Sequence, residues 1–351
     1  MKEQIDDDVN DTITMTTNLE TLINDDSYSI FKELNYPHMR RRHFYSTEVT
    51  SSAEKSMIKS PPITTAAAFL ANLMSPVTPP SNRIQDYVLG PVIGYGGFSV
   101  VHKAHHHLRI NHVRAIKVIN KYAMSDVDLH RFKRELTIWK SLCHPRIVNL
   151  QRILRRTNNN KHEIYLVCDY CPGGTLLQLL NKLTCLPEHH AKRIFKELCQ
   201  CVHYLHIDRK VCHKDLKLEN VLLDENGHVK LCDFGLAIYQ RSRENKRGTR
   251  EPVGGSLAYV APEQLQVAVP LACPKTDIWS LGVILYALVV GQLPFMDTFD
   301  LRLIQKIQDG IFEMPTFLSL PLQQLILSCL EKDPTKRPSI DQLLKYPWLQ
   351  L

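Results

Sequence analysis

The side chains best equipped for chemistry lie in two short stretches of the second half of the chain. Asp215, Lys217 and Asn220 alternate with apolar residues in the first stretch, and Asp233 lies between Cys and Phe in the second. Two carboxylates, an amide and a lysine are the groups needed to hold a magnesium–nucleotide complex and to orient a hydroxyl towards it. Either stretch alone would also fit a solvated charged loop.

A lysine lies inside an apolar strand earlier in the chain. Lys117 stands in the sequence Ala-Ile-Lys-Val-Ile, where an inward-facing ammonium group needs an anionic partner because burying it alone is unfavourable. The candidate partners are a phosphate group and Glu135, which lies on the helix that follows. For an isolated lysine, an exposed position at the edge of a sheet is the alternative.

A glycine-rich turn precedes this lysine, in the sequence Ile93-Gly-Tyr-Gly-Gly-Phe-Ser-Val-Val101. Glycines between two strands let backbone N–H groups approach a phosphate closely. A plain hairpin turn accounts for the glycines about as well, and Ser99 stands where the usual pattern has its third glycine. The turn alone is therefore a weak indication of phosphate binding.

Two kinds of element are needed to position these residues, and the periodicity of the sequence predicts both. The predicted strands are residues 88–93, 99–104, 113–119 and 164–168. The predicted helices are residues 128–142, 176–183, 188–206, 275–290, 301–310, 320–331 and 340–344. A strand-rich front half followed by a helical rear half predicts two lobes with a cleft between them.

Length and composition exclude several classes of protein. The chain has 351 residues, 44% of them apolar and 23% charged, as in soluble globular proteins and unlike disordered or collagen-like chains. No apolar run approaches the ~20 residues of a membrane-spanning helix. The acidic N-terminus lacks the apolar stretch of a signal peptide, so we expect the ten cysteines to be reduced thiols.

The chain changes character near residue 83. Residues 1–82 are rich in Ser, Thr, Asn and Asp and carry a net charge of −4, whereas residues 83–351 carry +11. The first segment cannot bury enough apolar surface to offset its ordering entropy, so we expect a mostly disordered N-terminal tail. Its apolar stretch, residues 64–74, is interpreted as residual helix in preference to a docking helix.

Taken in order along the chain, these motifs resemble the catalytic domain of eukaryotic protein kinases. The resemblance implies an α+β fold of two lobes, one a small antiparallel β-sheet with a single helix and the other larger and mainly helical. It covers roughly residues 87–348, so we divide the chain into a tail, residues 1–82, and a kinase domain, residues 83–351. The cofactors that it implies are ATP and Mg²⁺.

The resemblance assigns a role to each motif residue. Asp215 would orient the substrate hydroxyl and accept its proton, and Lys217 would steady the γ-phosphate. Lys117 would bind the α- and β-phosphates and pair with Glu135. The magnesium ligands would be Asn220 and Asp233. The residues expected around the nucleotide are Ile93, Gly94, Tyr95, Gly96, Gly97, Phe98, Ser99, Val100, Val101, Ala115, Lys117, Asp169, Cys171 and Leu222.

Further matches extend over the rest of the domain. Arg337 matches the arginine that pairs with Glu263 at the end of the family's activation segment. Cys168 falls at the gatekeeper position beside the hinge. The apolar stack that marks the active state in the family would consist of Trp139, Leu150, His213 and Phe234. Because every catalytic polar group is present, we do not expect an inactive member of the family.

Two sequence features resemble one class and branch of the family. Lys217 in Asp-Leu-Lys-Leu-Glu-Asn, with Gly-Ser-Leu-Ala-Tyr before Ala261-Pro-Glu263, resembles the serine/threonine class. Phe98-Ser99 in the glycine turn and the segment Gly282–Phe295 resemble the calcium/calmodulin-dependent and AMP-activated branch. The implied substrates are proteins with Ser or Thr acceptors.

Two departures from the family pattern concern control by phosphorylation. Lys214 replaces the arginine that usually precedes the catalytic aspartate and that clamps a phosphorylated loop residue in a bidentate fork. Pro252 occupies the usual phosphosite, and Thr249 is the nearest candidate acceptor. We therefore hypothesise that activity does not require phosphorylation of this loop.

Two further departures concern the substrate. The activation segment holds a basic run, residues 241–250, which is either a solvated loop or a binding site for an acidic or phosphorylated partner. Thr175 and Ala287 replace two carboxylates that basophilic relatives use, whereas Glu219 remains. A requirement for several arginines before the acceptor is therefore not expected.

Three cysteine and histidine features have the residue types of metal or redox sites. Cys168 and Cys171 have the CxxC spacing of a zinc site, but no second ligand pair is nearby in the sequence. Cys232 is a candidate reactive thiol, which burial would make inert. The run His105–His107 falls at a turn between two predicted strands, so an exposed polar loop is favoured over a metal site.

The sequence therefore predicts a serine/threonine protein kinase that acts in intracellular signalling. We expect it in the cytoplasm, with the nucleus as a second compartment, and we expect neither a nucleic-acid partner nor a membrane span. A kinase-fold scaffold with little turnover is the alternative. A small-molecule kinase is disfavoured by the complete activation segment.

Overall fold

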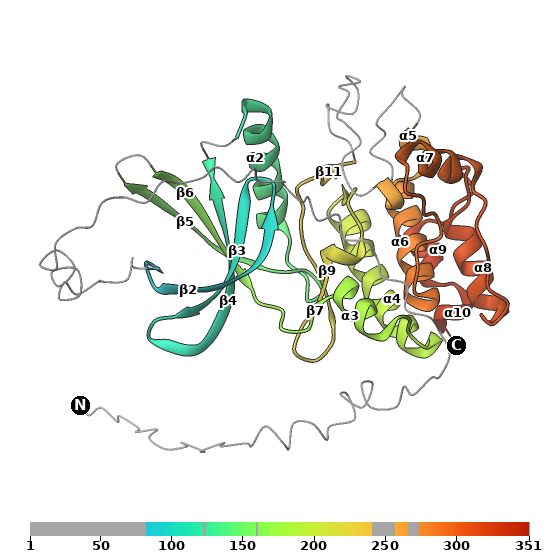
Figure 1. The fold of residues 1–351 in the computed structure, drawn as a ribbon, viewed down its shortest axis with the longest axis horizontal. Helices are drawn as coiled ribbons and strands as arrows, with labels where there is room; N and C mark the ends of the chain where they lie inside the picture. The colour runs from blue at the N-terminus through green and yellow to red at the C-terminus, as the bar shows by residue number, and fades with distance from the viewer. Residues whose placement is uncertain (1–81, 122–123, 159–160, 241–256, 266–273, 351) are drawn as a thin grey trace, which may run out of the picture. The chain divides into compact units, whose positions relative to one another are not determined.

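An antiparallel sheet with one long helix forms the first part of the fold, and a mainly helical part follows (Figure 1). The computed structural model describes residues 82–121, 124–158, 161–240, 257–265 and 274–350, all within one unit of the chain, His43–Leu351. The strands are β1 (Arg83–Ile84), β2 (Tyr87–Gly96), β3 (Ser99–His106), β4 (Arg109–Asn120), β5 (Leu150–Asn158), β6 (Lys161–Asp169), β7 (Gly174–Thr175), β8 (Val211–Cys212), β9 (Val221–Leu223), β10 (Val229–Leu231) and β11 (Ile238–Tyr239). The helices are α2 (Asp126–Ser141), α3 (Leu176–Leu183), α4 (Glu188–His203), α5 (Pro262–Leu265), α6 (Pro274–Val290), α7 (Asp300–Asp309), α8 (Leu320–Cys329), α9 (Ile340–Leu344) and α10 (Pro347–Gln350).

The main sheet has six strands in the order β1-β2-β3-β4-β6-β5, all paired antiparallel. Its two faces serve different purposes because successive side chains of a strand point to opposite sides. Ile116 on β4 faces Val167 on β6, in a small core on one side of the sheet. Lys117 follows on the other face of the sheet. On that face, Ala115 and Ile119 pack into the large core of the domain.

Helix α2 begins with a capping box, in which the Ser125 side chain accepts the N–H of Asp128 and the Asp128 carboxylate accepts the N–H of Ser125. Phe132, Ile138 and Trp139 lie on its buried face at helical spacing. Glu135 lies on that face too and is only 7% exposed, so the helix carries a carboxylate into the interior.

Helix α6 is the centre of the helical part. Every residue from Thr276 to Val289 is buried, and the helix is apolar nearly all round, as expected for a helix enclosed by other elements. Helices α4 and α8 pack against it. Gly282 permits close packing here, since a Cβ at this position would lie 2.6 Å from the Cβ of Cys329 on α8.

The predicted α+β fold of two lobes is confirmed, while several element boundaries differ from those predicted. Strand β5 was not predicted, α4 ends earlier than expected, and residues Tyr204–Asp208 form a π-helical turn after it. Among the residues that the structure describes, no helix is both long and apolar enough to cross a bilayer. The predicted tail, except for Asn82, lies outside the described residues.

Candidate active site

A cavity of about 760 Å³ lies among the sheet, helix α2 and the segments that follow α4. Its volume falls within the range of small-molecule sites, roughly 300–1,000 Å³. Most of the residues predicted to surround a nucleotide line it, namely Ile93, Gly94, Tyr95, Gly96, Gly97, Phe98, Ser99, Val101, Ala115, Lys117, Asp169, Cys171 and Leu222. Glu135, Asn220 and Asp233 line it as well. Val100 is not among the lining residues, because its side chain leaves the strand on the face opposite to that of Val101.

The turn between β2 and β3 lies over this cavity. Gly96 pairs with Ser99, and a Cβ at position 96 would lie 2.6 Å from the Ser99 hydroxyl oxygen. A Cβ at Gly97 would meet nothing within 4 Å. The serine that replaces the family's third glycine therefore fills the space that a side chain at position 96 would need.

Lys117 and Glu135 form an ion pair beside the cavity, with 2.9 Å between the lysine Nζ and the carboxylate Oε1. Burial alone would lower the pKa of Lys117, but the charges of Glu135 and Asp233 outweigh it and raise that pKa above its usual value. The ammonium group is therefore kept charged at the edge of the cavity. Glu135 is one of the two candidate partners that the sequence analysis gave for Lys117, and the one that the family resemblance implies.

The loop between β8 and β9 brings together two predicted catalytic residues, Asp215 and Lys217, and the predicted magnesium ligand Asn220. The Asp215 Oδ2 accepts a hydrogen bond from Asn220 Nδ2 at 2.9 Å and lies 2.9 Å from the Nζ of Lys217. Asn220 Nδ2 also donates to the Asp215 backbone carbonyl at 2.8 Å. Burial lowers the pKa of Lys217, and the Asp215 carboxylate outweighs that effect, so the net shift is upward.

Asp277, at the start of α6, holds this loop by its backbone. Its carboxylate is 1% exposed and accepts the N–H groups of His213 and Lys214 at 2.9 Å each, and the Nε2–H of His206 at 2.7 Å. Lys214 has a φ of 67°, in the left-handed region that side chains usually avoid. The buried acid therefore stabilises a strained turn directly before Asp215.

Asp233 reaches the same region from the segment after β10. Burial favours its protonated form, but the charge of Lys117 and the N–H of Gly235 outweigh burial, and the pKa of Asp233 falls below its ordinary value. Its φ is 63°, again in the left-handed region. The structure therefore presents an ionised carboxylate next to Lys117, on a strained backbone.

Two further predicted arrangements are present. Phe234 lies between Trp139 and His213, with ring centroids 6.4 and 5.1 Å away, and Leu150 packs against the same core. The predicted pair of Glu263 and Arg337 is a bidentate ion pair with two N–H···O distances of 2.7 Å. Residues 241–256, which include the basic run, Thr249 and Pro252, lie outside the described residues.

Comparison with known proteins decides which family these residues represent. The sequence pattern of the protein kinase domain matches residues 87–349. The chain belongs to the protein kinase family.

Several kinases resemble this one closely enough to align over most of the chain. Maternal embryonic leucine zipper kinase of Xenopus tropicalis is 37% identical over 263 residues, which are 75% of this chain and 39% of that protein. Serine/threonine protein kinase OSK3 of Oryza sativa subsp. indica is 36% identical over 272 residues, 77% of this chain and 51% of the relative. CBL-interacting protein kinase 15 of Oryza sativa subsp. japonica is 37% identical over 268 residues, 76% and 60% respectively. The chain thus spans about 40–60% of these relatives, which support the predicted branch of the family.

The thiols around the cavity of this kinase are protonated. Burial raises the pKa of Cys168 and of Cys171 to about 12 each. Burial likewise raises the pKa of Cys232 well above its usual value, and its thiol donates to the Asn220 carbonyl oxygen at 3.3 Å. Of the two readings of Cys232 left open by the sequence, these features favour the inert thiol.

Sequence reasoning missed two contributors to the site. The first is Asp277, in the first turn of the predicted helix 275–290, where a buried acid at the start of a long apolar helix needs hydrogen-bond partners. The second is Gln151, which donates to the hinge residue Asp169 at 2.7 Å and accepts from Arg114 at 2.8 Å. No sequence pattern predicts the contacts of Gln151 with Arg114 and Asp169, because β5 itself was not predicted.

Proposed function

We propose that the chain is a serine/threonine protein kinase that transfers the γ-phosphoryl group of ATP to Ser and Thr hydroxyls of proteins in intracellular signalling. The observation that carries the proposal is the Asp215 carboxylate, which lies 2.9 Å from both the Lys217 Nζ and the side-chain nitrogen of Asn220, a residue that lines the cavity. The family and the serine/threonine kinase relatives support the same activity.

The residues present fit magnesium and ATP, the cofactors of the family. Asp233 supplies an ionised carboxylate. The amide nitrogen of Asn220 donates to Asp215, so the side-chain oxygen of Asn220 can bind a hard cation. Lys117 supplies a fixed positive charge for phosphate oxygens. When bound, Mg²⁺ would neutralise charge on the transferring phosphates.

The two oxygens of Asp215 divide the work. Oδ2 receives Lys217 and Asn220, so we assign Oδ1 to the substrate hydroxyl and to the proton that it releases. We assign Lys217, held charged by Asp215, to steady the transferring group. Catalysis would therefore rest mainly on positioning and on preorganised charge.

The test compares wild type and Asp215→Asn with radiolabelled ATP and a generic protein substrate. A positioned base contributes typically about 10²–10⁴-fold, so the variant should lose at least about a hundredfold of the signal. Asp309→Asn, an exposed acid at the end of α7, is the matched control and should behave as wild type. Equal signals from wild type and Asp215→Asn would favour a kinase-fold scaffold instead.

We propose an acceptor preference without a strong demand for preceding arginines. Thr175 caps α3 with its hydroxyl, and Ala287 is fully buried in α6, so of the three positions only Glu219 offers an exposed carboxylate. The charge of residues 241–250 supports an acidic or phosphorylated partner. A positional-scanning peptide array tests both, since strong selection for arginine before the acceptor would contradict the proposal.

We also propose a division of the chain into a tail and a kinase domain, and a location in the cell. We place the kinase domain in residues 83–351 and a tail in residues 1–82. The charge difference between them supports this division, as does the first strand of the described residues, which starts at Arg83. We place the protein in the cytoplasm, with the nucleus as a second compartment. Limited proteolysis that cleaved first within residues 87–349 would contradict the division, and imaging of the tagged full chain tests the location.

A further inference from the structure

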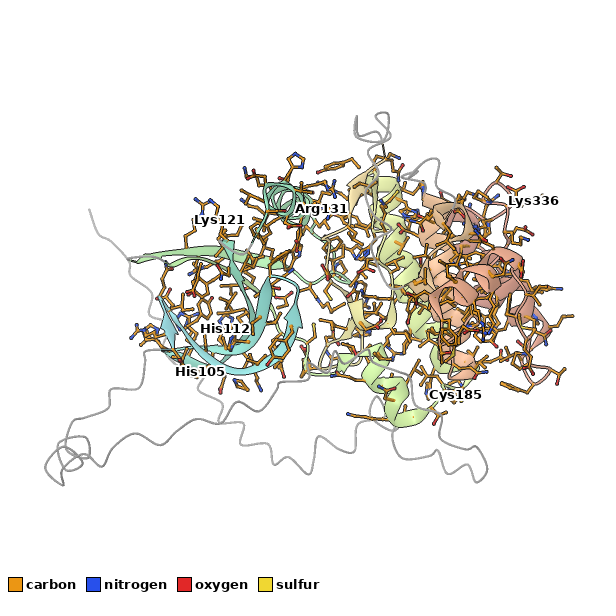
Figure 2. The ribbon with its side chains drawn as sticks, turned by 45° about the horizontal axis from the view of Figure 1, so that its top comes forward. His105, His112, Lys121, Arg131, Cys185 and Lys336 are labelled. Atoms are coloured by element: carbon orange, nitrogen blue, oxygen red, sulfur yellow. The ribbon has the colours of Figure 1, made fainter. Side chains whose placement is uncertain are left out.

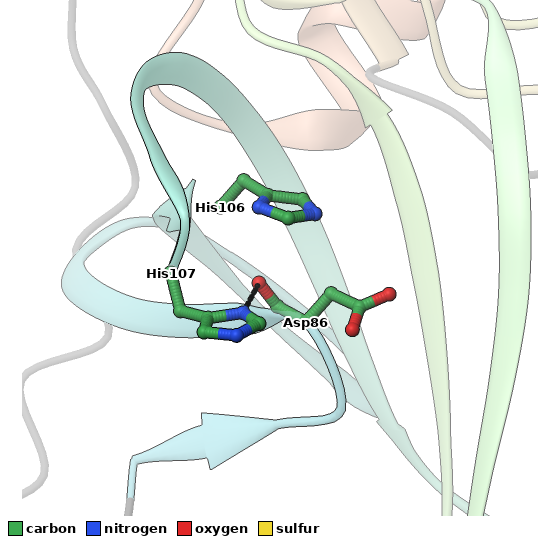
Figure 3. A group of neighbouring side chains, drawn as sticks. All are labelled: Asp86, His106 and His107. Carbon is green, nitrogen blue, oxygen red and sulfur yellow. Dashed lines mark hydrogen bonds between the residues drawn. The ribbon is translucent and has the colours of Figure 1, made fainter.

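A second group of chemically capable side chains lies where the β1–β2 turn meets the end of β3. Asp86, His106 and His107 each offer a ligand atom, and these atoms all lie within 4.8 Å of one another (Figure 3). The sequence does not show this group, because Asp86 is 20 residues away. The pairing of Tyr87 with His106 brings the acid to the histidines.

We propose that these three residues bind one Zn²⁺ ion or a similar divalent late transition-metal ion. Two imidazoles and a carboxylate suit zinc, copper or nickel, whereas magnesium and calcium prefer oxygen ligands alone. In a tetrahedral zinc site with bonds of ~2.0–2.1 Å, ligand atoms lie about 3.3 Å apart. Small rotations of side chains at a partly exposed turn close the remaining distance.

His107 is held in the tautomer that a metal requires. Its Nδ1 lies 3.0 Å from the backbone carbonyl oxygen of Asp86, an acceptor only, so this nitrogen carries the proton (Figure 3). The lone pair is then on Nε2. A ligating histidine that donates its other N–H to a carbonyl is the usual arrangement around protein-bound metals, where the second bond fixes the ring.

His106 needs one small change to ligate. Its ring lies nearly parallel to that of His107, at 13° and 5.3 Å between centroids, and its Nδ1 accepts the N–H of Leu108 at 3.2 Å. Ligation through either ring nitrogen ends this contact, since Nδ1 then holds the metal or the proton. Leu108 is 78% exposed at the tip of the hairpin, so its N–H can turn to water.

Two arginines compete with a metal ion for this site. The Arg83 Nη2 lies 2.9 Å from the His107 Nε2, and the Arg152 Nη1 lies 3.5 Å from the Asp86 Oδ2. Arg83 is exposed and can leave. Removing its guanidinium group should free the lone pair and reduce repulsion of a cation, so Arg83→Gln should bind zinc more tightly than wild type.

A second trio, His206, Cys212 and Asp277, has similar spacing but does not offer a metal site. Both carboxylate oxygens of Asp277 already accept the N–H groups of the catalytic loop and of His206. A metal ion there would have to displace the contacts that hold the loop. The trio therefore serves as an internal comparison for which no zinc-dependent change is expected.

The test measures Zn²⁺ binding to the full chain by competition with a chromogenic chelator, in excess Mg²⁺ so that the nucleotide site is saturated with its own ion. Loss of even an outer-shell partner typically weakens a metal site about 10- to 100-fold, so His107→Gln, His106→Gln and Asp86→Asn should each lose at least tenfold in affinity.

His105→Asn is the matched control. His105 pairs with Val88 and His106 with Tyr87, so the two side chains leave opposite faces of β3. Figure 2 labels His105 on β3 and His112 on β4.

Two readouts separate a metal site from a merely structural cluster. Electron paramagnetic resonance of the Cu²⁺-loaded chain should show two nitrogen ligands in wild type and one in His107→Gln. Each variant should melt at the wild-type temperature in chelator, which shows that it folds. Zinc should raise that temperature in wild type, His105→Asn and Arg83→Gln, but not in the three ligand variants. Equal zinc affinity in wild type and all three ligand variants, or no tightening in Arg83→Gln, would overturn the proposal.

Discussion

The Oδ1 atom of Asp277 accepts the backbone N–H of Lys214 at 2.9 Å, although the two residues are 63 positions apart in the sequence. The loop that carries Asp215 is thus fixed through its main chain, by an acid buried in the core. These contacts hold the loop by its backbone N–H groups, and none of them requires an arginine side chain that binds a phosphorylated activation segment. The geometry of the loop can therefore be complete without the arginine that Lys214 replaces.

Replacing Asp277 by Asn should destabilise the domain and reduce activity together. The amide keeps the shape of the carboxylate but loses the charge, and it turns an NH₂ group towards the donors that the carboxylate accepts. Breaking a buried charged network of this kind costs about 3–5 kcal/mol. Urea unfolding and phosphoryl transfer should both report the loss. Asp309→Asn should stay within about 0.5 kcal/mol of wild type, as exposed substitutions do.

The stabilities of wild type and Asp277→Asn should respond differently to acid. Burial raises the pKa of Asp277, but the hydrogen bond and charge of His206 outweigh it, so the folded-state pKa is lowered. Such a group stabilises the fold above its unfolded-state pKa, about 3.9, and loses that contribution as the pH falls through the folded-state value. The contribution of the Asp277 carboxylate to the stability difference between wild type and Asp277→Asn should therefore shrink as the pH falls below about pH 4. A difference that widens in acid would contradict this account.

Thr249→Ala should leave the purified kinase active. Lysine at position 214 cannot form the bidentate fork that reads a phosphorylated loop residue, and Asp277 holds the catalytic loop instead. Phosphoryl transfer by the alanine variant should match that of wild type, before and after treatment of both with phosphatase. Complete loss of activity in Thr249→Ala would show that loop phosphorylation is required.

Gly282→Ala should lower the melting temperature, whereas Gly97→Ala should not. At position 282 a Cβ would meet the Cβ of Cys329 at 2.6 Å and Leu330 at 3.0 Å, inside the core. Overpacking costs about 1–3 kcal/mol, which exceeds the gain of about 1 kcal/mol from replacing a helical glycine. At position 97 nothing lies within 4 Å. Calorimetry of both variants compares two additions of the same methyl group.

Alkylation at mildly alkaline pH should label Cys143 before the thiols of the cavity. Cys143 is exposed, whereas burial raises the pKa of Cys168 and Cys171 to about 12. A rise of three pKa units reduces the thiolate, which is the reacting species, on the order of a thousandfold. Mass spectrometry after iodoacetamide treatment gives the order, and the urea-unfolded chain provides the control. Early labelling of Cys232 would restore the reactive reading of that thiol.

The sequence predicted the parts of the fold whose own residues carry a strong pattern. A long apolar run predicts helix α6, and the spacing of Phe132 and Trp139 predicts helix α2. Helix α2 starts two residues before the predicted helix, because its capping box at Ser125 lies ahead of the apolar periodicity. Strand β5 was missed because it is an edge strand with exposed arginines, a composition that protects an open edge but hides the strand signal.

What sequence could not supply were contacts set by register and by long-range packing. The meeting of Asp86 with His106 depends on which residues of β2 and β3 pair, and local patterns do not fix that register. The protonated state of Cys232 depends on burial produced by distant segments. In contrast, the ion pair of Lys117 with Glu135 could be predicted, because the apolar strand left a phosphate or Glu135 as partner and the family resemblance implied the pair.

The left-handed backbones at Lys214 and Asp233 give the catalytic arrangement an energetic character of its own. Each non-glycine residue in that region costs about 1–2 kcal/mol relative to ordinary backbone. The segment around Asp233 therefore stores conformational energy, which the charge of Lys117 and the hydrogen bond from the Gly235 N–H help to offset. A ligand that breaks this hydrogen bond releases the stored energy, so the affinity of such a ligand includes a contribution from the conformation of the chain.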